Sequence, residues 1–520
     1  MAAPRRRERN PVTKLSLSVL LAATMLAGCN LAPTYVRPAG AIPATLPQGG
    51  PYPAAATDAR DVTAIGYRDF FVDPRLQKVI ETGLANNRNL RIAAGNVLQA
   101  RAQYRVQRSS LVPTTSLSAS GTYTNNIFGA TGATAGGGTG TGTGGTGTGG
   151  TGTGGTGTGG TGGTGGTGTG VGTGATSSNI EAYSVNAGFS QFELDLFGRI
   201  RNLTTAAQEQ YFASEEAQRS TRISLIAEIA TAWLTMASDQ EQLRLSRETL
   251  KTFQQTLDLT QAQFRIGVGS ELEVRQAETN YQSARNDIAT LQTTIARDQN
   301  ALNLLVGTTV TADLLPSDLG ERAYTLDALP GNLSSDALLR RPDVLQAEHQ
   351  LIAQNANVGA ARAAFFPSIS LTATLGTIST ALSGLFGGGS FTYTGSPAVS
   401  LPLFDGGQRK GNLDYVRASQ QVAVATYEQA IQTAFREVAD ALAQRGTIGE
   451  QVSAQTARAN AAGITARLSD ARFRAGVDSF LTTLDSQRSA YAARQALVTT
   501  RLTRENNTVE LYRSLGGGLQ

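Results

Sequence analysis

The stretch FRIGVGS at residues 264–270 returns 209 positions later as FRAGVDS at residues 473–479. The same offset holds without a gap as far as Gly307 and Gly516. Self-similarity at a fixed offset is the signature of an internal repeat. We therefore expect two structural repeats, each built around a turn of this kind.

A second pair of landmarks shows where the repeats differ. Residues 113–119, PTTSLSA, parallel residues 367–373, PSISLTA, at an offset of 254, whereas the Leu-Phe pair at 196–197 parallels the pair at 403–404 at an offset of 207. The first repeat must contain an insertion between its landmarks, and residues 129–174, almost pure Gly and Thr, supply it. Such sequence cannot bury enough apolar surface to offset its ordering entropy, so we predict a disordered loop.

Small polar and apolar side chains alternate on both sides of this loop and again in the second repeat. The alternating segments are residues 116–123, 183–190, 368–375 and 390–403. Each has about the length that a tilted strand needs to cross a bilayer. The hydroxylated face suits a wet lumen, and aromatic residues near strand ends suit an interfacial girdle. Those aromatic residues are Tyr123, Phe192, Phe197, Tyr393 and Phe404. One face of a soluble β-sandwich would alternate in the same way and is the alternative.

Two hairpins provide only four strands. In lipid, the edges of an open sheet would leave backbone donors and acceptors unpaired, at a cost of several kcal/mol each. We therefore expect further copies of the chain to complete a barrel. Two copies would reach the practical minimum of about eight strands, and three would give a twelve-stranded pore with room for water. The pattern requires an oligomer without fixing the number of chains.

Long helical segments follow both hairpins. Residues 199–264 contain neither Pro nor Gly and carry apolar residues at helical spacing, so they predict a helix of roughly 100 Å. The second repeat has a counterpart from residue 408 toward residue 473. Shorter helices are predicted at residues 76–111, 271–306, 344–365 and 478–515. Two short helices together match one long helix in length, which predicts antiparallel coiled coils stacked end to end. A soluble coiled-coil spacer is the alternative.

The first 28 residues have the features of a secretory signal, with a basic stretch followed by an apolar run. Cys29, the only cysteine, directly follows Leu-Ala-Gly at residues 26–28. This resembles the lipobox at which a bacterial lipoprotein is cleaved and its cysteine acylated. Cys29 is thus the predicted lipidation site, carrying diacylglycerol and palmitate. Asn30 is compatible with sorting to the outer membrane.

The composition argues against an enzyme and against a nucleic-acid partner. The chain has one Cys, one His and one Trp, so few reactive groups are present. His349 lies in a polar helical stretch and is expected at the surface, where it cannot assemble a metal site. The signal segment accounts for the whole net charge of +4, so the mature chain is near neutral. We expect no catalytic residues, no metal and no cofactor beyond the lipid.

Residues 339–344, LRRPDV, and 361–368, ARAAFFPS, resemble the outer-membrane factor family, the TolC-like channels, and specifically the lipoprotein branch in multidrug efflux systems. Residues 404–407, 473–478 and 512–518 extend a resemblance that covers nearly all of the mature chain in the family's order. It implies an α+β membrane protein. A homotrimer would form a twelve-stranded β-barrel in the outer membrane, four strands per chain, continued into the periplasm by a long antiparallel α-helical coiled-coil barrel.

The resemblance also orders the chain into domains. These are the signal peptide at 1–28, the first repeat at 29–306 including the Gly/Thr loop, an equatorial linker at 307–340 and the second repeat at 341–520. The segment before Phe70 and the C-terminus would join the linker in an equatorial belt.

Partners are implied as well, namely a periplasmic adaptor and an inner-membrane pump, commonly of the proton-driven RND type. The chain has no P-loop and no intramembrane charge relay, so it would be a passive conduit. The adaptor would dock at the periplasmic turns, formed by Gly267, Val268, Gly269 and Ser270 and by Gly476, Val477, Asp478 and Ser479.

In the family, polar bonds near the second turn close the periplasmic end. The matching gate positions are Leu481, Asp485, Arg488, Glu273 and Phe473. Asp485 and Arg488 lie three apart on one helix face, and three copies around an axis would form a ring of charge. An ordinary solvated pair is the alternative. Phe473 stands where the family often has Tyr, so a hydroxyl bond at that position is lost.

Two other functions remain open from the sequence. The outer channel of a type I protein secretion system shares the fold, although the lipobox and the Arg-Arg-Pro-Asp context of residues 340–343 favour efflux. A structural lipoprotein that tethers the outer membrane by coiled coils would not need the alternating strands.

Overall fold

The computed structural model describes residues 30–38, 42–43, 45–53, 65–126, 178–320, 324–325 and 335–517. The predicted signal peptide, Cys29 and the Gly/Thr loop lie outside these residues. Two compact units are formed. The described residues of Met1–Leu111, Asp195–Ser368 and Ser400–Gln520 make a helical unit, and those of Val112–Leu194 and Ile369–Val399 make a strand unit.

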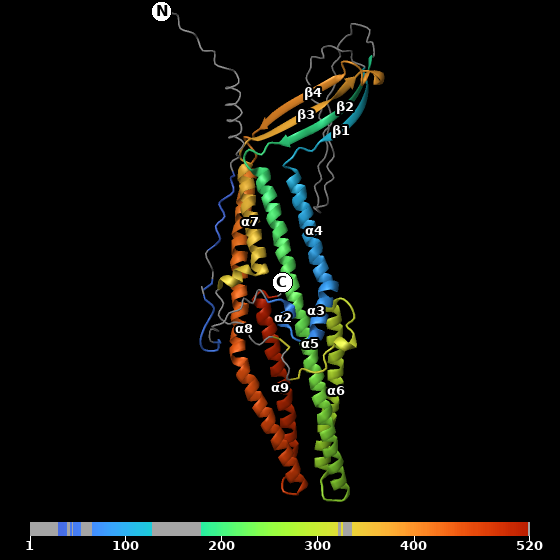
Figure 1. Ribbon diagram of the computed structural model, residues 1–520, viewed down its shortest axis with the longest axis vertical. Helices are drawn as coiled ribbons and strands as arrows, with labels where there is room; N and C mark the ends of the chain where they lie inside the picture. The colour runs from blue at the N-terminus through green and yellow to red at the C-terminus, as the bar shows by residue number, and fades with distance from the viewer. Residues whose placement is uncertain are drawn as a thin grey trace, which may run out of the picture. The chain divides into compact units, whose positions relative to one another are not determined.

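The elements follow one another in the order that the repeat predicts (Figure 1). In the first repeat these are α2 (Tyr67–Phe70), α3 (Pro74–Asn86), α4 (Arg88–Ser109), β1 (Ser116–Asn126), β2 (Ser178–Glu193), α5 (Arg199–Arg265) and α6 (Glu271–Val306). The short 3-10 helices η2 (Ala312–Leu314) and η3 (Ser335–Arg340) come next. The second repeat contains α7 (Pro342–Ala363), β3 (Ser368–Ser379), η4 (Leu382–Gly384), β4 (Phe391–Ser400), α8 (Gln408–Arg474) and α9 (Phe480–Ser514).

The two long helices have the same length and the same kinds of end. Both α5 and α8 contain 67 residues, and each begins after a glycine in the left-handed region, Gly198 at φ 76° and Gly407 at φ 90°. Each ends just before another, Gly267 at φ 78° and Gly476 at φ 74°. Only glycine adopts this conformation without steric cost, so the glycines fix where the helices begin and end. The predicted repeat is confirmed.

Each long helix is lined by shorter helices placed end to end (Figure 1). In the helical unit, α5 contacts α4 and α6, while α8 contacts α7 and α9. The Asn87 side chain, at the start of α4, donates to the carbonyl of Leu305 near the end of α6 at 2.7 Å. The Arg341 guanidinium, at the start of α7, donates to the carbonyl of Ser514 at the end of α9 at 2.6 Å. These residues correspond under the offsets of 254 and 209, so both repeats use the same joint.

One predicted helix is wrong, because this joint divides it into α3 and α4. Residues 76–111 were expected to form a single helix, but the chain breaks at Asn87, whose ψ of 133° is not helical. The Asn87 side chain accepts a hydrogen bond from the amide of Leu90 and so caps α4. Asparagine is a favoured N-cap residue, because its side chain replaces the missing intrahelical acceptor.

The equatorial segments of the helical unit form its main apolar core. Trp233 of α5 is fully buried, and its indole N–H donates to the carbonyl of Leu314 at 3.0 Å. Phe70 of α2 stacks on Tyr512 of α9 with ring centroids 3.9 Å apart. The linker, the segment that ends at Phe70 and the C-terminal helix therefore meet in one cluster, as the resemblance implied.

The strand unit is a four-stranded sheet in the order β1-β2-β3-β4. Leu117 pairs with Ala187, which pairs with Leu375, so one face is apolar across three strands. On the other face Ser120 and Ser184 are paired and their hydroxyls lie 2.9 Å apart. The predicted alternation of apolar and hydroxylated faces is confirmed. β4 is shorter than the predicted return strand and exposed at every position.

None of the helices in the described part of the chain is long and apolar enough to cross a membrane. Two of the girdle aromatics, Phe197 and Phe404, belong to the helical unit and not to the strands. Phe197 stacks on Phe366 with ring centroids 4.7 Å apart. Phe404 is 91 % exposed.

Candidate functional site

The α5–α6 and α8–α9 turns share one backbone design. In each, glycine in the left-handed region ends the long helix, and a serine caps the next one. Ser270 accepts from the amide of Glu273, and Ser479 accepts from the amide of Thr482. The Glu273 carboxylate also accepts from the amide of Ser270 at 2.9 Å, which completes a capping box.

The two turns differ in surface chemistry. The α5–α6 turn exposes Ile266, Val268 and Leu272, each by two thirds or more. The α8–α9 turn instead has an ion pair, in which Arg472 donates to both oxygens of Asp478 at 2.7 and 2.8 Å. This hydrogen bonding lowers the pKa of Asp478, so the carboxylate stays ionised within its own turn. The second turn also exposes Val477 and Leu481, so a partner would meet apolar side chains at both turns.

Three of the predicted gate residues lie together on α9. Leu481, Asp485 and Arg488 are all exposed and follow one another at a spacing of four and three, so they form a stripe along the helix, here called the gate stripe. Leu481 and Asp485 also line an open groove of about 660 Å³ between α8 and α9. Within the described residues no ion pair joins Asp485 to Arg488. Both charges are therefore available to groups outside this chain.

The other two predicted gate residues have internal contacts. Phe473 packs against Phe480 with ring centroids 5.6 Å apart, beside the cluster of Leu257, Ala277 and Leu484. Glu273 belongs to the first turn, where the capping box uses both its amide and its carboxylate. The structure thus brings Leu481, Asp485 and Arg488 together and puts Phe473 and Glu273 elsewhere.

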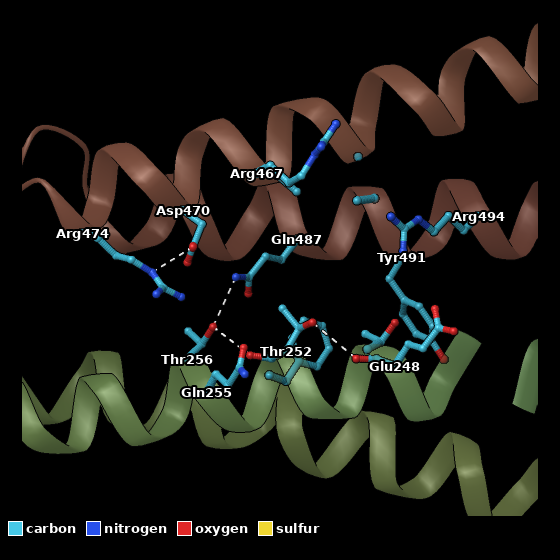
Figure 2. Close-up of a pocket in the computed structure, with 15 residues that line it drawn as sticks. Glu248, Thr252, Gln255, Thr256, Arg467, Asp470, Arg474, Gln487, Tyr491 and Arg494 are labelled. Carbon is cyan, nitrogen blue, oxygen red and sulfur yellow. Dashed lines mark hydrogen bonds and ion pairs between the residues drawn. The ribbon is translucent and has the colours of Figure 1, made fainter. Parts of the chain in front are cut away.

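A second stripe on α9 was not predicted from the sequence. Phe480, Leu484, Gln487 and Tyr491, here called the packed stripe, face α5 and α6. Their spacing of four, three and four is that of a coiled-coil seam, and this signal was available in the sequence. A cavity of about 330 Å³ lies between α5 and the α8–α9 pair, lined in part by Gln487 and Tyr491 (Figure 2).

The chain that follows Cys29 lies as a strap along α7. Tyr35 and Arg37 both donate to the carboxylate of Glu348, the guanidinium with two bonds of 2.8 and 2.7 Å. Asn355 donates to the carbonyl of Pro33 at 2.6 Å. These polar groups fix residues 33–37 to the helix.

The start of the strap lies near the end of α7. A Cβ atom on Gly359 would come within 2.7 Å of Ala32, so this glycine makes room for the strap. Arg362 donates to the carbonyl of Leu31 at 3.3 Å. α7 ends at Ala363, five residues before β3 begins. Leu31 and Ala32 are therefore held at the end of α7, from which the chain continues into a strand.

His349 is not the surface residue that the sequence suggested. Its Nδ1 lies 2.7 Å from the Glu209 carboxylate of α5, and its ring lies 5.5 Å from that of Phe212. The side chain is 27 % exposed. Packing of α7 on α5 buries this helix face, which a single helix pattern could not reveal. Among the described residues no three His, Cys, Asp or Glu side chains are grouped to hold a metal ion.

A four-stranded sheet with one apolar and one hydroxylated face, repeated coiled coils and an exposed charged stripe near the turns define a channel component. The sequence model of the family described as outer membrane efflux protein matches residues 79–308 and 333–517. The chain belongs to this family. The expected class and location, an efflux component of the outer membrane, are thereby confirmed.

Relatives match the chain over nearly its full length. The probable efflux pump outer membrane protein TtgC of Pseudomonas putida is 42 % identical over 510 residues, which are 98 % of this chain and 96 % of that protein. The cation efflux system protein CusC of Escherichia coli is 37 % identical, over 98 % of this chain and all of its own. The MtrE outer membrane channel of Neisseria gonorrhoeae, solved in its open state, is 33 % identical with a TM-score of 0.79 and covers 95 % of this chain and 99 % of its own.

Proposed function

We propose that the chain is the passive outer-membrane channel of a tripartite RND-type efflux system, which carries small molecules from the periplasm to the exterior. The observation that carries this is the match over almost the full length to proteins named as outer membrane proteins of antibiotic and solvent efflux pumps and to one named as a cation efflux system protein. The names of the relatives mention different compounds. The class of function can therefore be inferred for this chain from its relatives, whereas the individual substrate cannot.

The pore is a homotrimer. The sheet has two open edges, β1 and β4, and closure into a barrel would pair β4 of one chain with β1 of the next. Three chains give twelve strands. The helical unit also has uncovered surface, because α4 contains no buried residue and exposes Ile92, Leu98 and Val106. Neighbouring chains would cover this apolar face.

A lipid on Cys29 anchors the chain. The strap fixes Leu31 and Ala32 beside Gly359 and Arg362, at the end of α7 that continues into β3. If β3 crosses the membrane, the start of the strap lies close to the membrane surface, where acyl chains on the preceding cysteine could insert. The strap thus supports the lipobox interpretation of the sequence.

The turns receive the periplasmic adaptor, and the adaptor connects the channel to an inner-membrane pump that supplies the energy. The exposed apolar side chains of the α5–α6 turn would be buried by such a partner. Three copies of the gate stripe around the axis would form a ring of alternating charge, and this ring would narrow the channel until the adaptor engages.

The proposal is tested by accumulation of a fluorescent efflux substrate in the native host. Cells that lack this chain should retain several times more dye than wild-type cells, and expression of the chain should restore export. A matched strain that lacks the energised pump should retain as much dye as the channel deletion. Normal export in the channel deletion would contradict the proposed function.

A further inference from the structure

Tyr491 of α9 bonds to both helices of the other hairpin. Its hydroxyl lies 2.8 Å from the hydroxyl of Ser246 on α5 and 3.0 Å from the carboxylate of Asp287 on α6. A carboxylate can only accept, so Tyr491 donates its single proton to Asp287. The Ser246 hydroxyl also has one proton, and the Tyr491 oxygen and the Gln242 carbonyl, each at 2.8 Å, both accept from it. The three side chains form a directed chain of hydrogen bonds that runs from α5 through α9 to α6, and such bonds strengthen one another.

The environment favours this chain. Ser246 is fully buried, and Tyr491 is half-buried with its ring edge-on to Phe253 at 6.4 Å. Burial is the main reason that the pKa of Tyr491 rises to about 12. The hydroxyl therefore remains a proton donor throughout the physiological range of pH.

The contact of α9 with α5 and α6 in this region combines apolar packing with hydrogen bonds. The apolar part of the contact is one small cluster near the turns, formed by Leu257, Ala277, Phe480 and Leu484. Further along, the packed stripe contributes Gln487, which donates to Thr256 at 3.2 Å, and Tyr491. The cavity of about 330 Å³ lies beside these two residues, so close apolar packing is interrupted there (Figure 2). Beside this cavity the hydrogen bonds of Gln487 and Tyr491 contribute to the attachment.

The packed stripe and the gate stripe are neighbours on one helix. Leu481, Asp485 and Arg488 directly follow Phe480, Leu484 and Gln487 in the sequence. Successive residues of a helix are rotated by about 100°, so the two stripes occupy adjacent faces. Because a helix moves as a rigid element over this length, any shift that frees the packed stripe also moves the gate stripe.

We propose that Tyr491 is a positioning residue for the constriction. Its hydroxyl, bonded to Ser246 and Asp287, holds α9 at the distance and rotation at which the gate stripe narrows the channel. The inference rests on the proposed channel function and adds a determinant on the face of α9 next to the gate stripe.

The test is single-channel recording of the full-length purified oligomer in planar bilayers. Tyr491→Phe keeps the ring and removes only the hydroxyl, and Ser246→Ala removes the donor at the other end of the chain. Each should raise the open probability roughly tenfold, the effect of losing a hydrogen bond of about 1.4 kcal/mol. Thermal stability of the oligomer should change little. Tyr415→Phe removes a hydroxyl from a residue that is 71 % exposed and should leave gating unchanged.

A double-mutant cycle separates positioning from a general loosening of the fold. Tyr491→Phe combined with Asp287→Ala should open the channel no more than either change alone, because both break the same link. Fully additive effects of the two changes would overturn the proposal. It would also be overturned if the Tyr491→Phe channel stayed as closed as the wild type while Asp485→Ala combined with Arg488→Ala opened the channel. Silence from every variant, including that gate pair, would overturn the channel function itself.

Discussion

At the scale of single residues, the helical unit contains a pair of carboxyl groups that face each other across α5 and α6. Burial first, and then the hydrogen bond to and charge of Asp298, raise the pKa of Asp239 from 3.8 to about 6. Burial also raises the pKa of Asp298. Two carboxylates in one partly buried site cannot both ionise without cost, so the pair retains a proton to higher pH than a free aspartate would.

This pair makes stability depend on pH. Between pH values of about 4 and 6 the folded chain binds more protons at Asp239 than the unfolded chain. The free energy of unfolding should therefore fall as the pH rises through this window. The contribution of the carboxyl pair to it should be lowest above pH 6. Asp298→Asn should raise the free energy of unfolding at pH 7 by about 1 kcal/mol, a value reduced by the partial solvent exposure of the pair.

Thermal unfolding followed by circular dichroism at pH 5, 6 and 7 checks this prediction. The variant should lose much of the gain in stability that the wild type shows at lower pH. Asp258→Asn, on the exposed surface of α5, is the matched control and should keep the pH dependence of the wild type. An unchanged pH dependence in Asp298→Asn would show that the pair does not retain this proton.

At the scale of elements, the glycines at the two joints show how far the repeats are equivalent. Gly307 and Gly516 correspond under the offset of 209 and have nearly the same left-handed φ, 78° and 77°. Their surroundings differ, because a Cβ on Gly307 would lie 2.5 Å from the carbonyl oxygen of Asn86, whereas one on Gly516 would lie 3.8 Å from Arg341. A side chain at position 307 would therefore combine backbone strain with a steric clash, whereas one at position 516 would meet backbone strain alone.

Gly516→Ala should lower the free energy of unfolding by about 1 kcal/mol, and Gly307→Ala by about 2 kcal/mol or more. Chemical denaturation of the two variants in parallel measures the difference. Gly449→Ala is the control, because this glycine lies inside α8 with open space around it, so alanine should be neutral or stabilising. Equal losses at Gly307 and Gly516 would contradict the steric explanation.

The elements were the part of the fold most open to prediction. Long helices without Pro or Gly, glycines at their ends and strands with strict alternation are local signals, and α6 begins and ends at the predicted residues. The break at Asn87 was missed because the joint depends on a distant contact. The Asn87 side chain bonds to the Leu305 carbonyl near the end of α6, which lies far away in the sequence. His349 was misjudged for a similar reason, since the Glu209 partner lies on another helix.

The site was predictable to a smaller degree. The resemblance located Leu481, Asp485 and Arg488, and the structure puts them on one exposed stripe. It could not reveal the hydrogen bonds of Tyr491, because Ser246 and Asp287 are more than two hundred residues away in the sequence. Contacts between the repeats depend on how two hairpins pack, which neither hairpin encodes alone.

At the scale of the whole molecule, the proposed pore needs several chains to complete it. Each chain contributes one four-stranded sheet with two open edges and one exposed gate stripe. The gate pair Asp485 and Arg488 has no partner in an ion pair within the described chain, so its partners in a closed channel would come from neighbouring copies. Removing both charges should release the constriction and leave the strands unaffected.

Single-channel conductance in planar bilayers tests this central claim most directly, with the purified wild type compared with Asp485→Ala combined with Arg488→Ala. A pore that the gate stripe narrows should show small or rare openings in the wild type and large, stable openings in the variant. If both proteins are shown to be folded oligomers and neither conducts, the gated pore is contradicted. The alternative function, a structural lipoprotein that tethers the outer membrane, would then be favoured.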